Sequence, residues 1–293
     1  MTPGAALVRI HRVEYPLPIH YLSYAVWGAC YASGPATLPL IPVLLAALIH
    51  PVSMNALNAS VDLRTDAKNP RKRDLAQAVL LLGPRRIGAL ALAEMALCLA
   101  LCGWASILLG RALVVLTMAA IIACHLAYNL EPVHLKRRGF ANPLTLGVSF
   151  GFLPCVLSHA AVTGDFPARV WPIYAGLGLS VAARALWWMV PDARADAAAG
   201  TVTVAVRYGA RRMAVLSCGV ALAVPVLLGW GLWWSYGPGW AAVGVTAASA
   251  WFLGQFAALR SMTARSYAGL RRSFMTPMAA ANVVFALLPL AAG

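Results

Sequence analysis

Long apolar runs separated by short, basic connections dominate the sequence. A helix needs about 20 apolar residues to cross a hydrocarbon core of roughly 30 Å. Only 11% of the residues are charged, less than half the share of about 25% in soluble domains. We therefore predict an all-α, polytopic membrane protein in which residues 1–293 form one domain. The expected transmembrane helices are nine, at 17–34, 37–60, 87–109, 112–130, 141–161, 168–190, 213–233, 239–258 and 274–292.

The formal net charge of +14 comes from 23 basic and 9 acidic residues, and the basic residues concentrate in every second connection. This alternation is the positive-inside pattern, and it argues against a nucleic-acid partner. It predicts a multi-pass protein of the cell membrane with a cytoplasmic N-terminus. The basic connections hold Arg9 and Arg12; Arg64, Lys68, Arg71, Lys72, Arg73, Arg85 and Arg86; Lys136, Arg137 and Arg138; Arg194, Arg207, Arg211 and Arg212; and Arg260, Arg265, Arg271 and Arg272.

Four of the nine acids form two pairs with the same spacing, each at the expected cytoplasmic end of an apolar run. Asp62 and Asp66 follow the second run, with Asn58 four residues earlier, and Asp192 and Asp196 follow the sixth. Residues four apart share one face of a helix. One stripe is therefore expected to present an amide and two carboxylates, and a second stripe two more carboxylates.

Carboxylates grouped near hydrocarbon repel one another and are costly unless a cation neutralises them. Hard oxygen ligands suit Mg²⁺, which typically takes one or two carboxylates and completes its shell with water and substrate phosphate. The nearby basic residues, among them Lys68, Arg73 and Lys136, are then expected to contact phosphate. The alternative is a pair of helix ends whose acids are neutralised by neighbouring arginines.

Three ordered stretches resemble the motifs of the UbiA family of intramembrane prenyltransferases. The run from Asn58 to Asp66, followed by Lys68-Asn69-Pro70 and Arg73, is similar to the family's first aspartate-rich motif. The run from Asp192 to Thr203, with Gly209 beyond it, resembles the second motif. Between them, the stretch from Tyr128 through Pro132 to Lys136-Arg137-Arg138 resembles the family's tyrosine, proline and LKR segment.

The resemblance implies nine helices around a central cavity, with the active site facing the cytoplasm. It implies that Asp62, Asp66, Asp192 and Asp196 bind Mg²⁺ and, through it, the diphosphate of a prenyl substrate. Asn58, Arg73, Lys136, Tyr128, Lys68 and Arg184 are the expected diphosphate-binding residues. Loss of diphosphate would give an allylic cation that an aromatic or other hydrophobic acceptor captures. The sequence departs from the first motif at Ala59, where the family usually has Asp.

Three polar or aromatic side chains within the apolar runs each have a functional and a purely structural interpretation. Arg184 is expected either to pair with an acid of the cavity wall such as Glu94, or to hold diphosphate, or else to bond backbone carbonyls. Trp188, four residues before Asp192, is either a stabiliser of the cation or part of an interfacial belt. Glu94 is either a general base or a satisfied polar residue. His125 and His159 are expected to be packed and hydrogen-bonded.

Two other functions remain open at this point. A membrane terpene cyclase of the same family would close the cation on its own chain; Ala59 and the tryptophans favour it, whereas Asp62 favours transfer. A transporter could use the intramembrane Glu94 and Arg184. However, the acids cluster at one membrane face, whereas transporter sites usually lie near the midplane.

Overall fold

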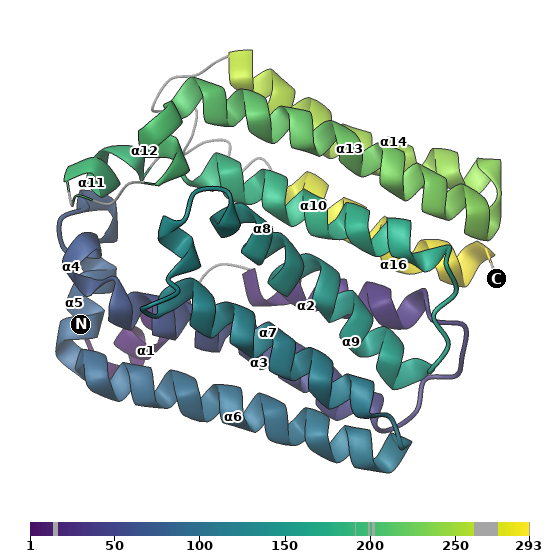
Figure 1. Ribbon diagram of the computed structural model, residues 1–293, viewed down its shortest axis with the longest axis horizontal. Helices are drawn as coiled ribbons and strands as arrows, with labels where there is room; N and C mark the ends of the chain where they lie inside the picture. The colour runs from purple at the N-terminus through teal and green to yellow at the C-terminus, as the bar shows by residue number, and fades with distance from the viewer. Residues whose placement is uncertain (14–16, 191, 199, 201–202, 261–274, 293) are drawn as a thin grey trace.

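The computed structural model describes residues 1–13, 17–190, 192–198, 200, 203–260 and 275–292, and this part of the chain is helical with no strand. The long helices lie side by side in one bundle (Figure 1). This bears out the all-α prediction. Three basic residues, Arg265, Arg271 and Arg272, and the side chains of Arg71, Arg194 and Arg260, lie outside the described residues.

Each predicted apolar run coincides with a helical segment. The segments are α2 (Leu17–Cys30), α3 (Leu40–Val61), α6 (Pro84–Leu109), α7 (Ala112–Asn129), the continuous α8 (Ala141–Gly147), η3 (Val148–Phe152) and α9 (Leu153–Val162), α10 (Val170–Trp188), α13 (Ala210–Tyr236), α14 (Pro238–Arg260) and α16 (Met275–Ala292). Among the described residues, five segments are long and apolar enough to cross a membrane: α3, α6, α7, α8 to α9, and α13. The chain is thus a multi-pass membrane protein, whereas nine crossings and a cytoplasmic N-terminus stay predictions.

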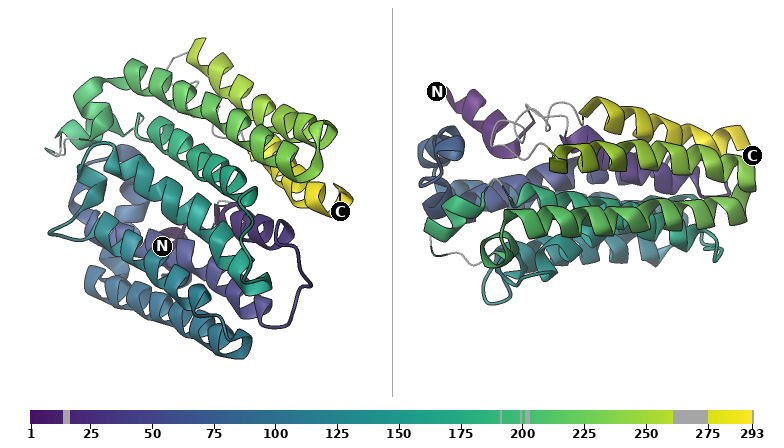
Figure 2. Two further views of the ribbon diagram at one scale, coloured as in Figure 1. Left: turned by 45° about the vertical axis from the view of Figure 1, so that its right-hand side comes forward. Right: turned by 90° about the horizontal axis from the view of Figure 1, so that it is seen from above.

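The short elements gather at the end of the bundle where the chain begins, while the C-terminus lies at the opposite end (Figures 1 and 2). All of them belong to connections that the charge pattern assigns to one side of the membrane. They are α1 (Pro3–His11), α4 (Leu63–Asp66), η1 (Pro70–Lys72), α5 (Arg73–Leu82), η2 (Leu135–Arg137), α11 (Ala193–Ala198) and α12 (Val204–Tyr208).

Close packing of glycines fixes α10 against the fifth helical segment. A Cβ at Gly147 would lie 2.8 Å from the carbonyl oxygen of Gly178, and a Cβ at Gly151 would lie 2.8 Å from the Gly178 Cα. Small residues let backbones approach in this way where apolar burial gives no drive for helix association. Because Gly151 lies in the π-helical turn η3, this contact holds both η3 and α10 in place.

Candidate functional site

The first acid pair lies where a long helix ends and a short one begins. Asp62 caps α3, and α4 ends at Asp66. Both side chains are buried, with Asp62 6% and Asp66 2% exposed. Burying a carboxylate is costly unless a charge or a hydrogen bond compensates, so the partners of these two groups define the site.

Lys136 compensates Asp62. Its ammonium forms an ion pair with the Asp62 carboxylate, across 74 residues of sequence. The backbone that carries Lys136 is held by Asn142, whose Nδ2 donates to the Lys136 carbonyl oxygen at 2.9 Å. Tyr128 in turn donates its hydroxyl to Asn142 Oδ1 at 3.4 Å. Tyr128 therefore supports the loop that presents Lys136.

Lys72 and Asn69 join the two acid motifs. Lys72 Nζ lies 3.0 Å from Asp66 Oδ1 and 3.3 Å from Asp192 Oδ2. Asn69 Nδ2 donates to the other oxygen of Asp192 at 3.2 Å. Two carboxylates that are 126 residues apart in sequence thus share one ammonium group. The two acid-bearing helix ends converge at one end of the bundle.

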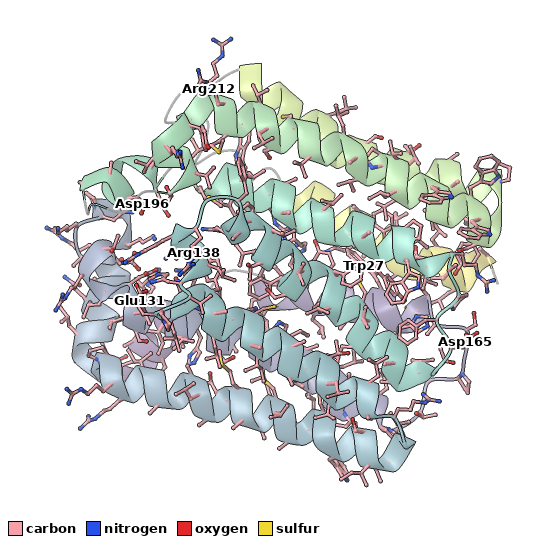
Figure 3. The ribbon with its side chains drawn as sticks, viewed as in Figure 1. Trp27, Glu131, Arg138, Asp165, Asp196 and Arg212 are labelled. Atoms are coloured by element: carbon pink, nitrogen blue, oxygen red, sulfur yellow. The ribbon has the colours of Figure 1, made fainter. Side chains whose placement is uncertain are left out.

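The second motif adds Asp196 to this end of the molecule (Figure 3). Asp196 lies in α11 and forms a side-chain hydrogen bond with Thr203. Thr203 is also the N-cap of α12, where its Oγ1 accepts a hydrogen bond from the Val206 amide at 3.4 Å. One threonine therefore fixes both the start of α12 and the second acid of the motif.

The acids differ in their ease of ionisation. Burial alone would raise the pKa of Asp62, but the Lys136 ammonium lowers that pKa below its ordinary value. Burial raises the pKa of Asp66, and the nearby Lys72 offsets this only in part. Burial and the charge of Asp192 raise the pKa of Asp196. Asp66 and Asp196 are therefore the groups that gain most from an additional cation.

The donor set fits a hydrated divalent cation that is also held by its substrate. Asp66 Oδ2 is buried and has no hydrogen-bond partner among the residues that the structure describes, although carboxylates in proteins normally use both oxygens. The ammonium groups of Lys72 and Lys136 lie against carboxylates, as a bound cation would. Among the described residues, no three of His, Cys, Asp and Glu group closely enough to hold a metal by themselves. This suits Mg²⁺, which keeps waters and takes substrate oxygens.

The remaining polar residues of the first motif have different surroundings. Asn58 Nδ2 donates to Asn129 Oδ1 at 2.9 Å, so this amide faces α7. Lys68 and Arg73 are exposed on the connection that begins after Asp66. The expected single stripe is therefore divided: its acids face lysines, and its amide faces another helix.

The predicted pairing of Arg184 with Glu94 is wrong. Glu94 Oε1 lies 3.0 Å from His11 Nε2 of α1, so Glu94 is a polar residue with a partner on the N-terminal helix. Arg184 instead donates to His20 Nε2 of α2. Its guanidinium carbon also lies 5.1 Å from the centre of the Trp188 ring and 5.7 Å from that of Tyr21. Glu94 lies on α6 and faces α1, whereas Arg184 lies on α10 and faces α2, so the two side chains meet different helices.

The sequence did not indicate three contributors to the site. Asn129 and Asn142 are buried amides whose partners are 71 residues and 14 residues away, respectively. Arg12 was interpreted only as a topological charge, yet its positive charge helps to lower the pKa of Asp62. The one sequence feature that could have pointed to Asn129 is its position among polar residues at the end of an apolar run.

The family profile described as the UbiA prenyltransferase family matches residues 21–283, which is most of the chain. The chain belongs to this family. Among curated proteins, the comparison finds no match to this UbiA-family sequence.

Solved structures of UbiA homologues share the fold. A homologue from Archaeoglobus fulgidus bound to DMAPP and Mg²⁺ has 16% identity and a TM-score of 0.77, with 98% of each chain covered. The same homologue bound to GPP and Mg²⁺ has 16% identity and a TM-score of 0.76, covering 98% of this chain and 99% of that one. A homologue from Aeropyrum pernix K1 without ligand has 22% identity and a TM-score of 0.73, covering 92% and 97%.

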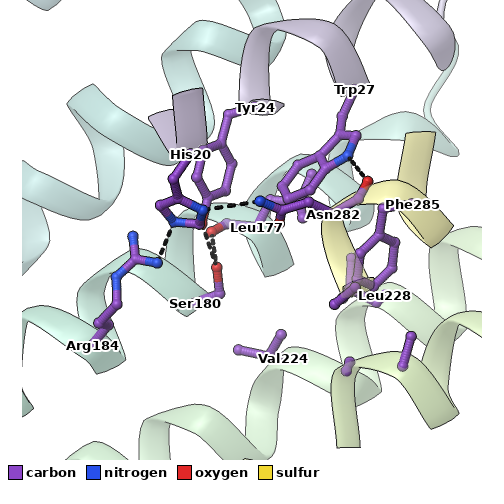
Figure 4. Close-up of a pocket in the computed structure, with 13 residues that line it drawn as sticks. His20, Tyr24, Trp27, Leu177, Ser180, Arg184, Val224, Leu228, Asn282 and Phe285 are labelled. Atoms are coloured by element: carbon purple, nitrogen blue, oxygen red, sulfur yellow. Dashed lines mark hydrogen bonds between the residues drawn. The ribbon is translucent and has the colours of Figure 1, made fainter. Parts of the chain in front are cut away.

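The UbiA-family bundle also holds an apolar pocket with one polar wall (Figure 4). It lies between α2, α10, α13, α14 and α16. The side chains of Trp27, Leu228 and Phe285 line its apolar part. At the polar wall, Asn282 Nδ2 lies 3.0 Å from His20 Nδ1. Because Arg184 can only donate, His20 Nε2 accepts its hydrogen bond and His20 Nδ1 carries the ring proton. The Asn282 amide group is then expected to present its oxygen, rather than its nitrogen, to Nδ1.

Proposed function

We propose that this protein is a Mg²⁺-dependent prenyltransferase that transfers a prenyl group from an isoprenyl diphosphate to an aromatic or other hydrophobic acceptor. The observation that carries the proposal is the meeting of the two acid motifs across Lys72 and Asn69. Membership of the UbiA family supports it, as do the homologues bound to DMAPP or GPP with Mg²⁺. The proposal takes residues 1–293 as a single domain of the cell membrane, with the site at the cytoplasmic face.

The four aspartates would hold the metal. Asp62 and Asp66 would supply oxygens from the first motif, and Asp192 and Asp196 from the second. When bound, Mg²⁺ would neutralise the negative charge that develops on the departing diphosphate. The unpartnered Asp66 Oδ2 is the oxygen best placed to gain a ligand.

The lysines would then turn from carboxylates to the substrate. Lys72 and Lys136 lie within ion-pair distance of the acids, and a diphosphate held between the motifs would offer both of them new acceptors. Arg73 and Lys68 would meet the diphosphate from the exposed side, while Asn58 would orient Asn129 beneath it. Donors positioned where charge develops lower the barrier to breaking the bond between the prenyl C1 and the diphosphate oxygen.

The electron pair of that bond leaves with the diphosphate, and an allylic cation remains. The acceptor forms a new bond to C1 and gives up a proton. Water must be kept away from the allylic cation until the acceptor captures it, and the apolar bundle beneath the site would exclude that water. The pocket of Trp27, Leu228 and Phe285 would take the prenyl chain. Trp188, whose ring centre lies 5.1 Å from the Arg184 guanidinium carbon, would be the candidate to offer a ring face to the cation.

Mass spectrometry of the products from purified protein tests the proposal. The protein is incubated with Mg²⁺, a panel of prenyl diphosphates, and phenolic or quinone precursors as acceptors. A prenylated acceptor supports transfer. A hydrocarbon or terpene alcohol formed equally well without acceptor would support a terpene cyclase instead. Absence of diphosphate release with every substrate would contradict both reactions and favour a transporter.

A further inference from the structure

Deeper in the bundle lie two stacked histidines and a buried serine that is adjacent in sequence to Phe150, the aromatic neighbour of both histidines, and these three residues are here called the imidazole cluster. It comprises His50 of α3, His125 of α7 and Ser149 of η3. All three are fully enclosed, with His50 1% exposed and the other two 0%. The imidazole rings stack with their centres 5.3 Å apart and their planes at 12°.

Four polar atoms of the imidazole cluster have no hydrogen-bond partner in the part of the chain that the structure describes. They are His50 Nε2, both ring nitrogens of His125, and Ser149 Oγ. His50 Nδ1 lies 3.2 Å from the Ala47 carbonyl oxygen and so carries the proton, which makes Nε2 an acceptor. Each such buried atom destabilises the fold, because it has lost its hydrogen bonds to water without replacement.

His159 shows that this family member can satisfy a buried histidine completely. Its Nδ1 lies 2.5 Å from the Tyr174 hydroxyl and its Nε2 2.8 Å from the Asp165 carbonyl oxygen. The expectation that both lone histidines are packed and hydrogen-bonded is confirmed for His159. It is wrong for His125, which is packed but unbonded through its ring. A cluster kept unsatisfied within a bundle that can satisfy its histidines points to a ligand.

The position of the imidazole cluster relates it to the acid motifs. Asn129 Nδ2 donates to the His125 carbonyl oxygen at 2.9 Å, and Asn129 Oδ1 accepts from Asn58. Asn58 lies one helical turn before Asp62, and His125 lies one turn before Asn129. By helix rise, His125 thus lies about two turns, or roughly 11 Å, further into the bundle than Asp62, and His50, twelve residues before Asp62 on α3, lies roughly 18 Å further in.

An aromatic side chain on an unusual backbone turn forms one wall of the cluster. The Phe150 ring lies 4.7 Å from the His125 ring and 5.7 Å from the His50 ring, centre to centre. Phe150 and Ser149 both belong to η3, a π-helical turn. Such turns are rare and occur often at functional sites. The turn brings an aromatic face to the two imidazoles, and the buried Ser149 hydroxyl precedes that aromatic residue in the chain.

We propose that the imidazole cluster binds a neutral hydroxyl group of the acceptor, remote from the atom that is prenylated. The proposal rests on the proposed prenyl transfer. A hydroxyl group both donates and accepts, so it can donate to His50 Nε2 and accept from a ring nitrogen of His125. A carboxylate would be costly in this enclosed, apolar position. An aromatic acceptor of two fused rings would lie between the diphosphate and the cluster, with its ring beside Phe150.

Two naphthols test this proposal on the full chain purified in detergent. Binding of 1,5-dihydroxynaphthalene and of 1-naphthol is measured by their fluorescence. The wild type is expected to prefer the diol about tenfold, as one well-made hydrogen bond allows. His125→Phe and His50→Phe are expected to reduce this preference to nearly one. Ile121→Val, a buried change one turn from His125 that removes no polar atom, is the control and retains the preference.

Thermal unfolding of the ligand-free variants separates ligand binding from a structural role. His125→Phe removes two unsatisfied nitrogens and keeps a ring, so its melting temperature is expected to equal or exceed that of the wild type. A lower melting temperature with an unchanged diol preference would mean that His125 is structural. If His125→Phe does not fold, His50→Phe gives the same test.

Equal binding of both naphthols by the wild type, or binding of neither, would overturn the proposal. Diphosphate release from geranyl diphosphate is measured on the same preparations. A protein that prefers the diol but releases no diphosphate would contradict the proposed transferase function alone. A protein that releases diphosphate without the preference would contradict only the role of the cluster.

Discussion

Asp62 and Asp66 lie four residues apart, but their ionised forms have opposite effects on stability. Burial would raise both pKa values; Lys136 reverses this for Asp62, whereas Lys72 does not for Asp66. A lowered pKa means that ionised Asp62 stabilises the fold above its ordinary pKa, and that this stability is lost as the pH falls through the folded value. A raised pKa means that ionised Asp66 costs stability at neutral pH.

The substitutions Asp62→Asn and Asp66→Asn should therefore separate stability from activity. At pH 7, Asp62→Asn should lower the free energy of unfolding by roughly 1–3 kcal/mol, because Lys136 loses its charged partner. Asp66→Asn should leave the ligand-free protein as stable as the wild type or more so. Both should reduce Mg²⁺-dependent diphosphate release at least about 100-fold. Thermal melts and a diphosphate assay check this; a destabilised Asp66→Asn would contradict the assignment.

Lys72 balances the charge of two carboxylates at once. In Lys72→Gln, Asp66 and Asp192 should repel each other, so the metal-free protein should melt at a lower temperature. Mg²⁺ should then raise the melting temperature more in the variant than in the wild type, because it replaces the missing charge. Arg64→Gln, an exposed change on α4, serves as the control. An equal Mg²⁺ effect in both proteins would contradict the bridging role.

The sequence could single out the two acid pairs as candidates, because i, i+4 spacing is a local property and acids are rare in this chain. It could not predict their partners. Lys136, Asn129 and Lys72 reach Asp62, Asn58 and Asp192 from segments that are far away in the sequence. The missing hydrogen bonds of His125 were likewise invisible, since they depend on how α3, α7 and η3 pack.

At the scale of elements, α1 is one of the short helices that the apolar pattern did not predict. It is short, and it packs beside α5 and α3 at the end of the bundle that holds the acids. His11 of α1 lies 3.0 Å from Glu94 of α6. Burial alone would lower the pKa of His11, but the hydrogen bond and charge of Glu94 raise it above its ordinary value.

The docking of α1 should consequently depend on pH. A raised histidine pKa means that the ion pair stabilises the fold fully below about pH 6.5 and that this stability is lost as the pH rises through the folded value. His11→Gln should lower the melting temperature at pH 5.5 by an amount equivalent to about 1 kcal/mol or less. Wild type and variant should converge at pH 9. A difference that persists unchanged at pH 9 would contradict this account.

The long elements were predictable because an apolar run of spanning length leaves few alternatives to a helix. The π-helical turn η3 and the short helices α4, α11 and α12 were not, since these depend on contacts between connections. The break at Asp62 between α3 and α4 also divided the stripe that simple periodicity predicted.

At the scale of the whole molecule, the charge pattern and the bundle agree. The short helices, which belong to basic connections, lie at one end, where both acid motifs meet. A multi-pass UbiA-family protein with this arrangement presents its charged site at one membrane face and its apolar pocket within the bundle. The central claim is that this face grips a divalent cation and a diphosphate together.

Release of diphosphate from geranyl diphosphate by purified protein, with and without Mg²⁺, tests that claim most directly. We expect release by the wild type only with Mg²⁺. Asp62→Ala and Asp192→Ala, which remove one acid from each motif, should each abolish release while the protein still inserts into membranes. Normal turnover by either variant, or release by the wild type in the presence of a chelator, would contradict the account.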